Sequence, residues 1–258
     1  MKSNDLNINI HAWINMYIIW SSKIPPADKN HLINRKEQWL DHSFKNQTHI
    51  HSNKFLSPIH PNVNLYLLSV IDELIKNYNI NGIHLDYIRF KDNHYGNNKF
   101  GQNYFSIDQN NKNWDKFKRD RVSNLVKSIS ILIKNKKNNI IFSAAVKPNL
   151  LEAKNRFSQE WGSWLKNNII DLVFPMNYYN EIDLFNRDLN LMRNRIPEIL
   201  HEKIIIGIGC YNQSNEDVID KVVLVQLRNM GGVSFFSYDN HKKDLNWFKP
   251  IKNKLFAN

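Results

Sequence analysis

Residues 79–90 read Asn79-Ile80-Asn81-Gly82-Ile83-His84-Leu85-Asp86-Tyr87-Ile88-Arg89-Phe90, an apolar, β-branched run with one carboxylate and one guanidinium near its end. As a strand, this run places His84 and Asp86 on one face and Arg89 on the opposite face. An ionised carboxylate in an apolar layer is costly unless it is paired. We therefore expect Asp86 to mark the point where a buried strand opens into a cleft. A structural ion pair between Asp86 and Arg89 is the alternative.

The chain of 258 residues is 42% hydrophobic and 23% charged, which is typical of a globular protein. We expect a single domain over residues 1–258. The sequence contains no apolar run long enough to cross a membrane, and no hydrophobic signal region follows Met1. The single cysteine, Cys210, excludes an intramolecular disulfide and lies in an apolar run, so we expect it to fill the core.

The net charge of +11 comes from 35 Lys and Arg residues against 24 Asp and Glu residues. Such a charge favours an acidic partner, but the basic residues are spread over the whole length. The densest cluster, residues 134–139, lies where a helix is expected to end, and cations suit that position. The sequence has no glycine-rich phosphate loop, no paired Cys/His zinc pattern and no H-E-x-x-H helix. We expect neither a cofactor nor a metal.

Strands and helices alternate along the chain. An amphipathic helix begins at Pro61, and others are expected around Val122–Ile133, Gln159–Lys166, Leu184–Met192 and Val218–Leu227, the last capped by Ser214 and Asp217. A long loop with one short helix is expected from residue 16 to about residue 55. The expected strands are Asn7–Asn15, Gly82–Phe90, Ile140–Lys147, Asp171–Tyr179, Ile204–Tyr211 and Gly232–Tyr238.

Each expected strand is a continuous apolar run, which predicts a parallel sheet covered by helices and an α/β fold. Every strand also ends in polar or aromatic residues, as the strands of a (β/α) barrel do. Small residues such as Ser143, Ala145, Gly207 and Gly209 leave room for a ligand. Only six strands are found where a closed barrel needs eight. Either the N-terminus is truncated, or another chain fills the gap, or the sheet is open.

These segments together resemble, in order and over nearly the whole chain, the bacterial glycosyl-hydrolase-like family 10. The central motif Gly82–Phe90 is the most specific of them. The other matching pieces are His11–Asn15, Asn34-Arg35 with Trp39, Ser143–Val146, Trp161 with Trp164, Pro175–Tyr178, Gly207–Gly209 and Phe235–Tyr238.

The resemblance implies a (β/α)8 TIM barrel that acts on polysaccharide and is usually exported or attached to the bacterial envelope. Because that family has two strands before the His-Ala-Trp segment, this chain corresponds to strands three to eight, with Asp86 at the end of the fourth. A homo-oligomer or a missing N-terminal segment would then cover the open edge. In chitinase-type barrels a D-x-D-x-E strand supplies the acid; here those positions are His84, Asp86 and Ile88, so Asp86 is the only inward carboxylate.

Glycoside hydrolysis ordinarily needs a proton donor and a second carboxylate. We expect Asp86 to be the acid, with His84 tuning it or simply buried and hydrogen-bonded. For the second carboxylate Asp239, at the end of the last strand, ranks ahead of Glu181 and Asp183. If the substrate carries an N-acetyl group, that group can replace the protein nucleophile.

Residues expected to bind substrate are those next to the acid or at the strand ends. Aromatic rings stack on the apolar faces of sugars, cations suit an anionic or acetylated substituent, and amides bind hydroxyl groups. Besides Trp20, the set is His11, Trp13, Asn15, Tyr17, His84, Arg89, Lys147, Asn149, Asn177, Tyr178, Tyr179, Tyr211 and Tyr238.

Two rival functions stay open on the sequence. The first is an inactive, carbohydrate-binding remnant of such a barrel, which would bind glycans without cutting them. The second is a binder of nucleic acid or another anionic polymer, which would lose affinity steeply with salt. Because the basic residues are scattered, we do not expect nucleic acid as a partner. The sequence does not name the sugar, the linkage or the stereochemical outcome.

Overall fold

The computed structural model describes residues 8–45, 53–136 and 139–256. A parallel sheet runs through this part of the chain, in the order β1-β4-β5-β6, and continues through two backbone bridges into the pair β7-β8. The strands are β1 (His11–Asn15), β4 (Gly82–Asp86), β5 (Ile141–Val146), β6 (Leu172–Pro175), β7 (Ile205–Gly209) and β8 (Gly232–Phe236). The expectation of a parallel α/β fold is confirmed.

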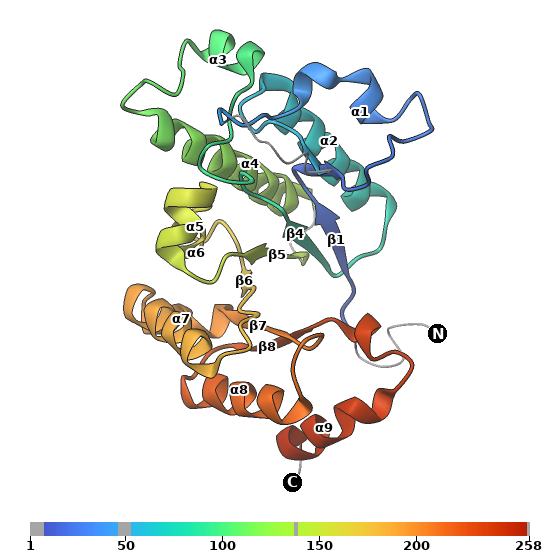
Figure 1. Cartoon of the computed structure of the whole chain (residues 1–258), viewed down its shortest axis with the longest axis vertical. Coiled ribbons are helices and arrows are strands. Elements are labelled where there is room, and N and C mark those ends of the chain that lie inside the picture. The colour runs from blue at the N-terminus through green and yellow to red at the C-terminus, as the bar shows by residue number, and fades with distance from the viewer. Residues whose placement is uncertain (1–7, 46–52, 137–138, 257–258) are drawn as a thin grey trace.

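Helices follow the strands and lie on the outside of the sheet (Figure 1). They are α1 (Leu32–Arg35), α2 (Pro61–Asn77), α3 (Lys99–Phe105), α4 (Trp114–Lys136), α5 (Leu150–Phe157), α6 (Trp161–Lys166), α7 (Ile182–Arg195), α8 (Asn215–Leu227) and α9 (Lys249–Phe256). Helices α2 and α4 pack on each other beside the first strands, and α7 and α8 pack beside the last. None of the helices in the described ranges is long and apolar enough to span a membrane.

Local sequence signals explain the ends of several elements. Pro61 begins α2 after His60, whose imidazole accepts the Asn62 amide. Ser214 and Asp217 form the expected capping box of α8. Pro175 is the last residue of β6, where its missing N–H does not interrupt the sheet.

The segment between β1 and α2 is only partly a loop. It contains β2 (Ile18–Trp20), α1, the 3-10 helix η2 (Glu37–Trp39) and β3 (Lys54–Phe55), and β2 and β3 pair antiparallel. Helices α3, α5 and α9 are not predicted from the sequence, because each is short or lies in a polar stretch. Strand β4 ends at Asp86, four residues earlier than expected, because Tyr87 adopts a left-handed conformation with φ of 51°.

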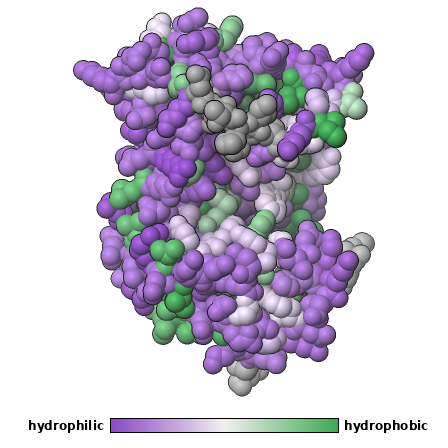
Figure 2. Space-filling view, in the orientation of Figure 1, coloured by the Kyte–Doolittle hydropathy of each residue, from purple (hydrophilic) through white to green (hydrophobic). Residues whose placement is uncertain are grey.

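The core is continuous across the sheet and helices, with residues such as Ile71, Leu85, Val126 and Trp164 fully buried. Cys210 is buried there, as predicted. The outer surface is mostly hydrophilic in the view of Figure 2. Among the described residues, β1 pairs only with β4 and β8 only with β7. The rings of Trp13 and Phe236 nevertheless meet edge to face, with centroids 5.9 Å apart, so these two outermost strands lie close to each other.

Candidate active site

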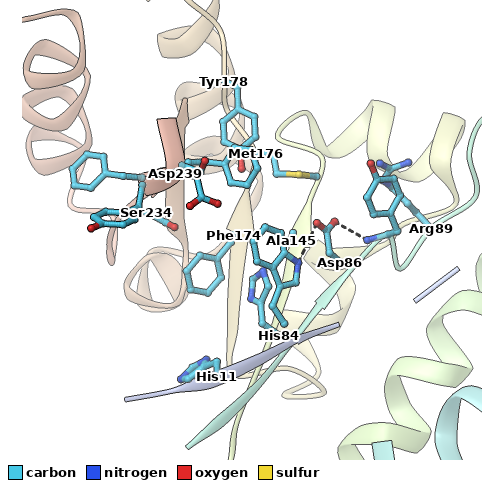
Figure 3. A pocket seen from close by; sticks show the side chains of 17 residues that line it. His11, His84, Asp86, Arg89, Ala145, Phe174, Met176, Tyr178, Ser234 and Asp239 are labelled. Carbon is cyan, nitrogen blue, oxygen red and sulfur yellow. Dashed lines mark hydrogen bonds between the residues drawn. The ribbon is translucent and has the colours of Figure 1, made fainter. Parts of the chain in front are cut away.

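A cleft of about 610 Å³ lies at the carboxyl ends of the parallel strands. Strands β1, β4, β5, β6, β7 and β8 or the segments after them all contribute to its wall (Figure 3). The lining residues are His11, Trp13, His84, Asp86, Tyr87, Arg89, Ala145, Phe174, Met176, Tyr178, Gly207, Ser234, Phe235, Phe236, Ser237, Tyr238 and Asp239. This is the edge at which barrel enzymes place their catalytic groups.

Asp86 is the last residue of β4 and is 7% exposed. Its Oδ1 accepts the backbone N–H of Tyr87 at 2.6 Å, and its Oδ2 accepts the indole N–H of Trp13 at 3.3 Å. Within the described ranges, no ion pair joins Asp86 to Arg89. The alternative of a structural ion pair is therefore wrong, and the carboxylate is held at the rim of the core by two N–H donors.

His84 lies one layer deeper than Asp86 in the same cleft. Its Nδ1 is 2.9 Å from the Ser143 hydroxyl, which itself donates to the Ile83 carbonyl at 3.3 Å. Burial, with a smaller contribution from neighbouring His11, lowers the pKa of His84 to about 4. His84 is thus a neutral imidazole at physiological pH.

His11 lines the floor of the cleft beside His84. Its ring occupies the space over Gly82, where a Cβ atom would come within 2.5 Å of the imidazole. Burial lowers the pKa of His11 as well. Gly82 is therefore needed for packing, because the absence of a Cβ atom lets the His11 imidazole of β1 lie against β4.

An aromatic wall stands opposite the motif. The ring of Tyr178 stacks on Phe236 with centroids 5.4 Å apart and planes at 10°, and Tyr211 meets both rings edge to face. Burial, followed by the charge of Asp86, raises the pKa of the Tyr178 hydroxyl. That hydroxyl therefore stays protonated and can donate a hydrogen bond into the cleft.

Arg89 lines the cleft beside Asp86, although strand alternation predicted the opposite face. The correction follows from Tyr87, whose left-handed backbone ends the strand and turns the side chains after it. The guanidinium lies over the rings of Tyr87 and Phe157, and Lys147 shares the Phe157 ring. Burial lowers the pKa of both Arg89 and Lys147.

Asp239 lies in the 3-10 helix η4 (Tyr238–Asn240), directly after β8. Figure 3 shows it across the cleft from Asp86, on the side away from Arg89. Its carboxylate is exposed, with Lys242 at 3.5 Å as its only ion-pair partner in the described ranges. Glu181 and Asp183, the other candidates, are at the start of α7 and do not line this cleft.

Several of the expected substrate-binding residues lie outside the cleft. Tyr17 is buried and donates its hydroxyl to Asn64 at 2.9 Å. Asn149 caps α5, accepting the amides of Leu151 and Glu152, because its side chain satisfies the free N–H groups of the first turn.

The remaining expected residues, Lys147 among them, do not line the cleft either. Asn177 is fully buried and donates to the Phe185 carbonyl at 3.0 Å. Tyr179 lies under the guanidinium of Arg187. Asn15 is exposed beside Asp86 in the register of β1 and β4, and Tyr211 borders the aromatic wall.

Tyr87, Phe174, Met176, Phe236 and the serines around it line the cleft but were not among the expected site residues. Alternation in the last strand was the available signal for Phe236, whereas the turn at Tyr87 had none. No three His, Cys, Asp or Glu side chains in ranges 8–45, 53–136 and 139–256 are grouped closely enough to hold a metal ion.

A family model described as Glycosyl hydrolase-like 10 matches residues 2–223. Similar solved structures include the PgaB (BpsB) glycoside hydrolase domain of Bordetella bronchiseptica, with a TM-score of 0.72 and 12% identity over 96% of this chain and 76% of that one. A class V chitinase of Pseudomonas fluorescens Pf-5 has a TM-score of 0.59 and 11% identity over 98% of this chain and 82% of that one.

Alpha-L-fucosidase isoenzyme 2 of Paenibacillus thiaminolyticus has a TM-score of 0.66 and 11% identity over 99% of this chain and 38% of that one. No curated protein matches the sequence. At these identities the structural likeness shows the fold alone, and that fold is the barrel type that the sequence predicted.

Proposed function

This chain belongs to the glycosyl hydrolase-like 10 family. We propose that it forms one barrel domain and that it is a glycoside hydrolase, which cleaves a bacterial or environmental polysaccharide. The observation that supports this most is the position of Asp86. A carboxylate at the end of a buried parallel strand faces a cleft of about 610 Å³, a volume suited to sugar rings. Aromatic rings and a second carboxylate stand opposite it.

In this proposal Asp86 gives a proton to the glycosidic oxygen. Oδ1 is tied to the Tyr87 amide at 2.6 Å, whereas the 3.3 Å contact of Oδ2 with Trp13 is longer. Oδ2 is therefore the oxygen that carries the proton to the leaving group. Proton transfer by a positioned carboxyl group contributes about 10²- to 10⁴-fold to the rate.

Asp239 is the proposed second carboxylate. It acts either as the nucleophile or as the base for water, depending on its separation from Asp86 when substrate is bound. An N-acetyl group of the substrate would make it dispensable. The stacked rings of Tyr178 and Phe236 support a sugar ring, with the Tyr178 hydroxyl as a donor.

The decisive experiment measures new reducing ends from a panel of polysaccharides with the purified chain and with Asp86→Asn. The variant is nearly isosteric but cannot donate a proton, so we expect a loss of at least about 100-fold in kcat with unchanged glycan binding. Asp220→Asn, at an exposed position of α8, is the matched control and keeps full activity. Equal activity of wild type and Asp86→Asn on a cleaved substrate would refute the role of Asp86.

A carbohydrate-binding protein without turnover is the second candidate. The unpaired edges of β1 and β8 in the described residues favour it, as does Trp13, which lines the cleft and is 58% exposed. In that case glycans bind wild type and Asp86→Asn equally, and neither chain releases reducing ends from any polymer in the panel.

A further inference from the structure

Two basic side chains share one aromatic ring next to Asp86. The guanidinium of Arg89 lies 5.3 Å from the centroid of Phe157, and the ammonium of Lys147 lies 4.7 Å from it. Arg89 also lies 4.8 Å from the centroid of Tyr87, and both Arg89 and Tyr87 line the cleft. Both cations are only partly exposed. The Phe157 ring thus holds two positive charges, and one of them, that of Arg89, lines the cleft.

Neither of these cations has an acidic partner within 4.0 Å among the described residues. Arg156 makes the contrast clear: it lies over the same ring at 5.1 Å, but it is paired with Asp92 at 2.8 Å and Glu152 at 2.9 Å. The chain therefore neutralises the cation that faces outward and leaves the two beside the cleft without an ion pair.

Two other buried cations of the described residues are also satisfied, whereas the buried Nζ of Lys91, like Nε of Arg89, has no hydrogen-bond partner there. Lys118 donates to the Asn93 carbonyl at 2.7 Å and pairs with Asp115 at 3.3 Å. Lys221 donates to the Asn180 carbonyl at 2.8 Å and to Gln213. By comparison, the buried Nε of Arg89 has no hydrogen-bond partner in the described residues, and its Nη1 reaches only the Phe90 carbonyl at 3.5 Å.

Partly buried like charges repel each other, so this pair is unfavourable for folding unless an anion joins it. The charge of Arg89 helps to lower the pKa of Lys147, after burial, which shows that the two cations sense each other. Glu152 opposes this effect more than Asp86 does, but Glu152 is already paired with Arg156 at 2.9 Å. The oxygens of Asp86 already accept the Tyr87 amide and the Trp13 indole. Arg89 and Lys147 therefore keep a positive charge that is available to a ligand.

We infer that Arg89 and Lys147 form an anion subsite beside Asp86 that binds the carboxylate of an acidic sugar in the polysaccharide. The planar guanidinium suits the two oxygens of a carboxylate, and the lysine adds a point charge. The Phe157 and Tyr87 rings hold both cations in place. This inference rests on the proposed function, because it names the class of sugar that lies next to the scissile bond.

The test compares binding of matched polymers by affinity electrophoresis. Polygalacturonate is set against the same polymer after chemical reduction of its carboxyl groups, so that only the charge differs. We expect the wild-type chain to bind the acidic polymer about 10- to 100-fold more tightly, as a charge-assisted contact implies. Dextran, carboxymethyl-dextran and dextran sulfate separate a carboxylate from a sulfate ester.

Variants assign the preference to the two residues. Arg89→Gln and Lys147→Met are each expected to remove most of the preference, and Arg89→Lys to retain part of it because the charge remains without the planar fork. Arg156→Gln, which removes the same charge from the same ring, is the control and keeps the preference. Arg89→Lys also keeps the test valid if Arg89→Gln does not fold.

Three results would overturn the inference. One is equal binding of the acidic and the reduced polymer, another is equal loss of preference in Arg156→Gln, and the third is tighter binding of dextran sulfate than of carboxymethyl-dextran. Cleavage of neutral polymers without any acidic preference refutes the subsite and leaves the hydrolase proposal standing. A preference that depends on Arg89 in a chain that cuts no polymer refutes the hydrolase proposal and leaves the subsite standing.

Discussion

Trp13 of β1 donates its indole N–H to Oδ2 of Asp86 on the neighbouring strand, at 3.3 Å. The two residues are not opposite each other in the sheet: Trp13 is in register with His84, and Asn15 with Asp86. The indole therefore reaches diagonally along the strands. The same ring meets Phe236 of β8 at 5.9 Å, so one side chain links the candidate acid to the opposite wall of the cleft.

Trp13→Phe tests this link. The variant keeps an aromatic ring against Phe236 but removes the donor to Asp86, so the carboxyl group loses one of its two positioning contacts. We expect kcat to fall about tenfold with little change in KM, because a hydrogen bond of this kind is worth about 1–2 kcal/mol. Steady-state kinetics of wild type and Trp13→Phe on a polysaccharide that the chain cleaves measures both constants. A change in KM alone would assign Trp13 to substrate stacking instead.

Asp239→Asn tests the second carboxylate. The Asp239 side chain is 79% exposed, so its replacement is expected to leave the melting temperature unchanged. If it acts as nucleophile or base, activity falls by at least about 100-fold. Lys242→Met, which removes its ion-pair partner, is the companion variant with near-normal activity. Full activity of Asp239→Asn would point to another base or to an N-acetyl group of the substrate.

His84 makes the stability of the fold sensitive to acid. Burial lowers its pKa from 6.5 to about 4, so below about pH 6.5 the unfolded chain takes up a proton that the folded chain does not. The free energy of unfolding is therefore expected to fall between about pH 6.5 and 4, by about 3 kcal/mol in total. Urea unfolding of wild type and His84→Gln across this range measures the difference. Parallel pH profiles would contradict it.

Asp41 gives the free energy of unfolding a pH dependence of the opposite sign. It is buried and accepts the Ser57 hydroxyl at 3.0 Å, and burial raises its pKa from 3.8 to about 7. Above about pH 3.8 the unfolded chain releases a proton that the folded chain keeps, so stability falls as pH rises towards 7, by about 4 kcal/mol in total. Asp41→Asn cannot titrate and is expected to lose this slope, which the same urea experiments detect.

Gly207 of β7 keeps the cleft open. A Cβ atom at this position would lie 2.9 Å from the Pro175 carbonyl oxygen and 3.0 Å from Cε1 of Tyr178. Gly207→Ala is expected to destabilise the fold by about 1–3 kcal/mol and to reduce activity by displacing Tyr178. Gly162→Ala in α6 is the comparison, because there the nearest atom is the Cδ2 of Leu150, the end of a side chain, and alanine favours the helix. Thermal unfolding and activity assays of both variants check the contrast.

Much of the site could be predicted because strand ends are visible in the sequence. The apolar runs before Asp86 and Asp239 locate both carboxylates at strand ends, and parallel strands bring those ends to one edge. Asn149 and Asn177 also lie near the ends of expected strands. In the structure, however, Asn149 caps a helix and Asn177 is buried against Phe185. The strand-end rule predicts that both amides bind sugar, because the sequence does not show which backbone groups need a hydrogen-bond partner.

The order of apolar runs, glycines and caps by itself determined that this chain is a parallel α/β barrel-type protein with an acidic residue at the end of β4, because periodicity and burial are local properties. Only the tertiary structure decided that Arg89 joins Asp86 in the cleft. A single left-handed residue, Tyr87, ends the alternation there, and the rings of Phe157 and Trp13 arrive from distant parts of the chain. Contacts between distant segments set charge and hydrogen bonding at the site, and no local pattern encodes them.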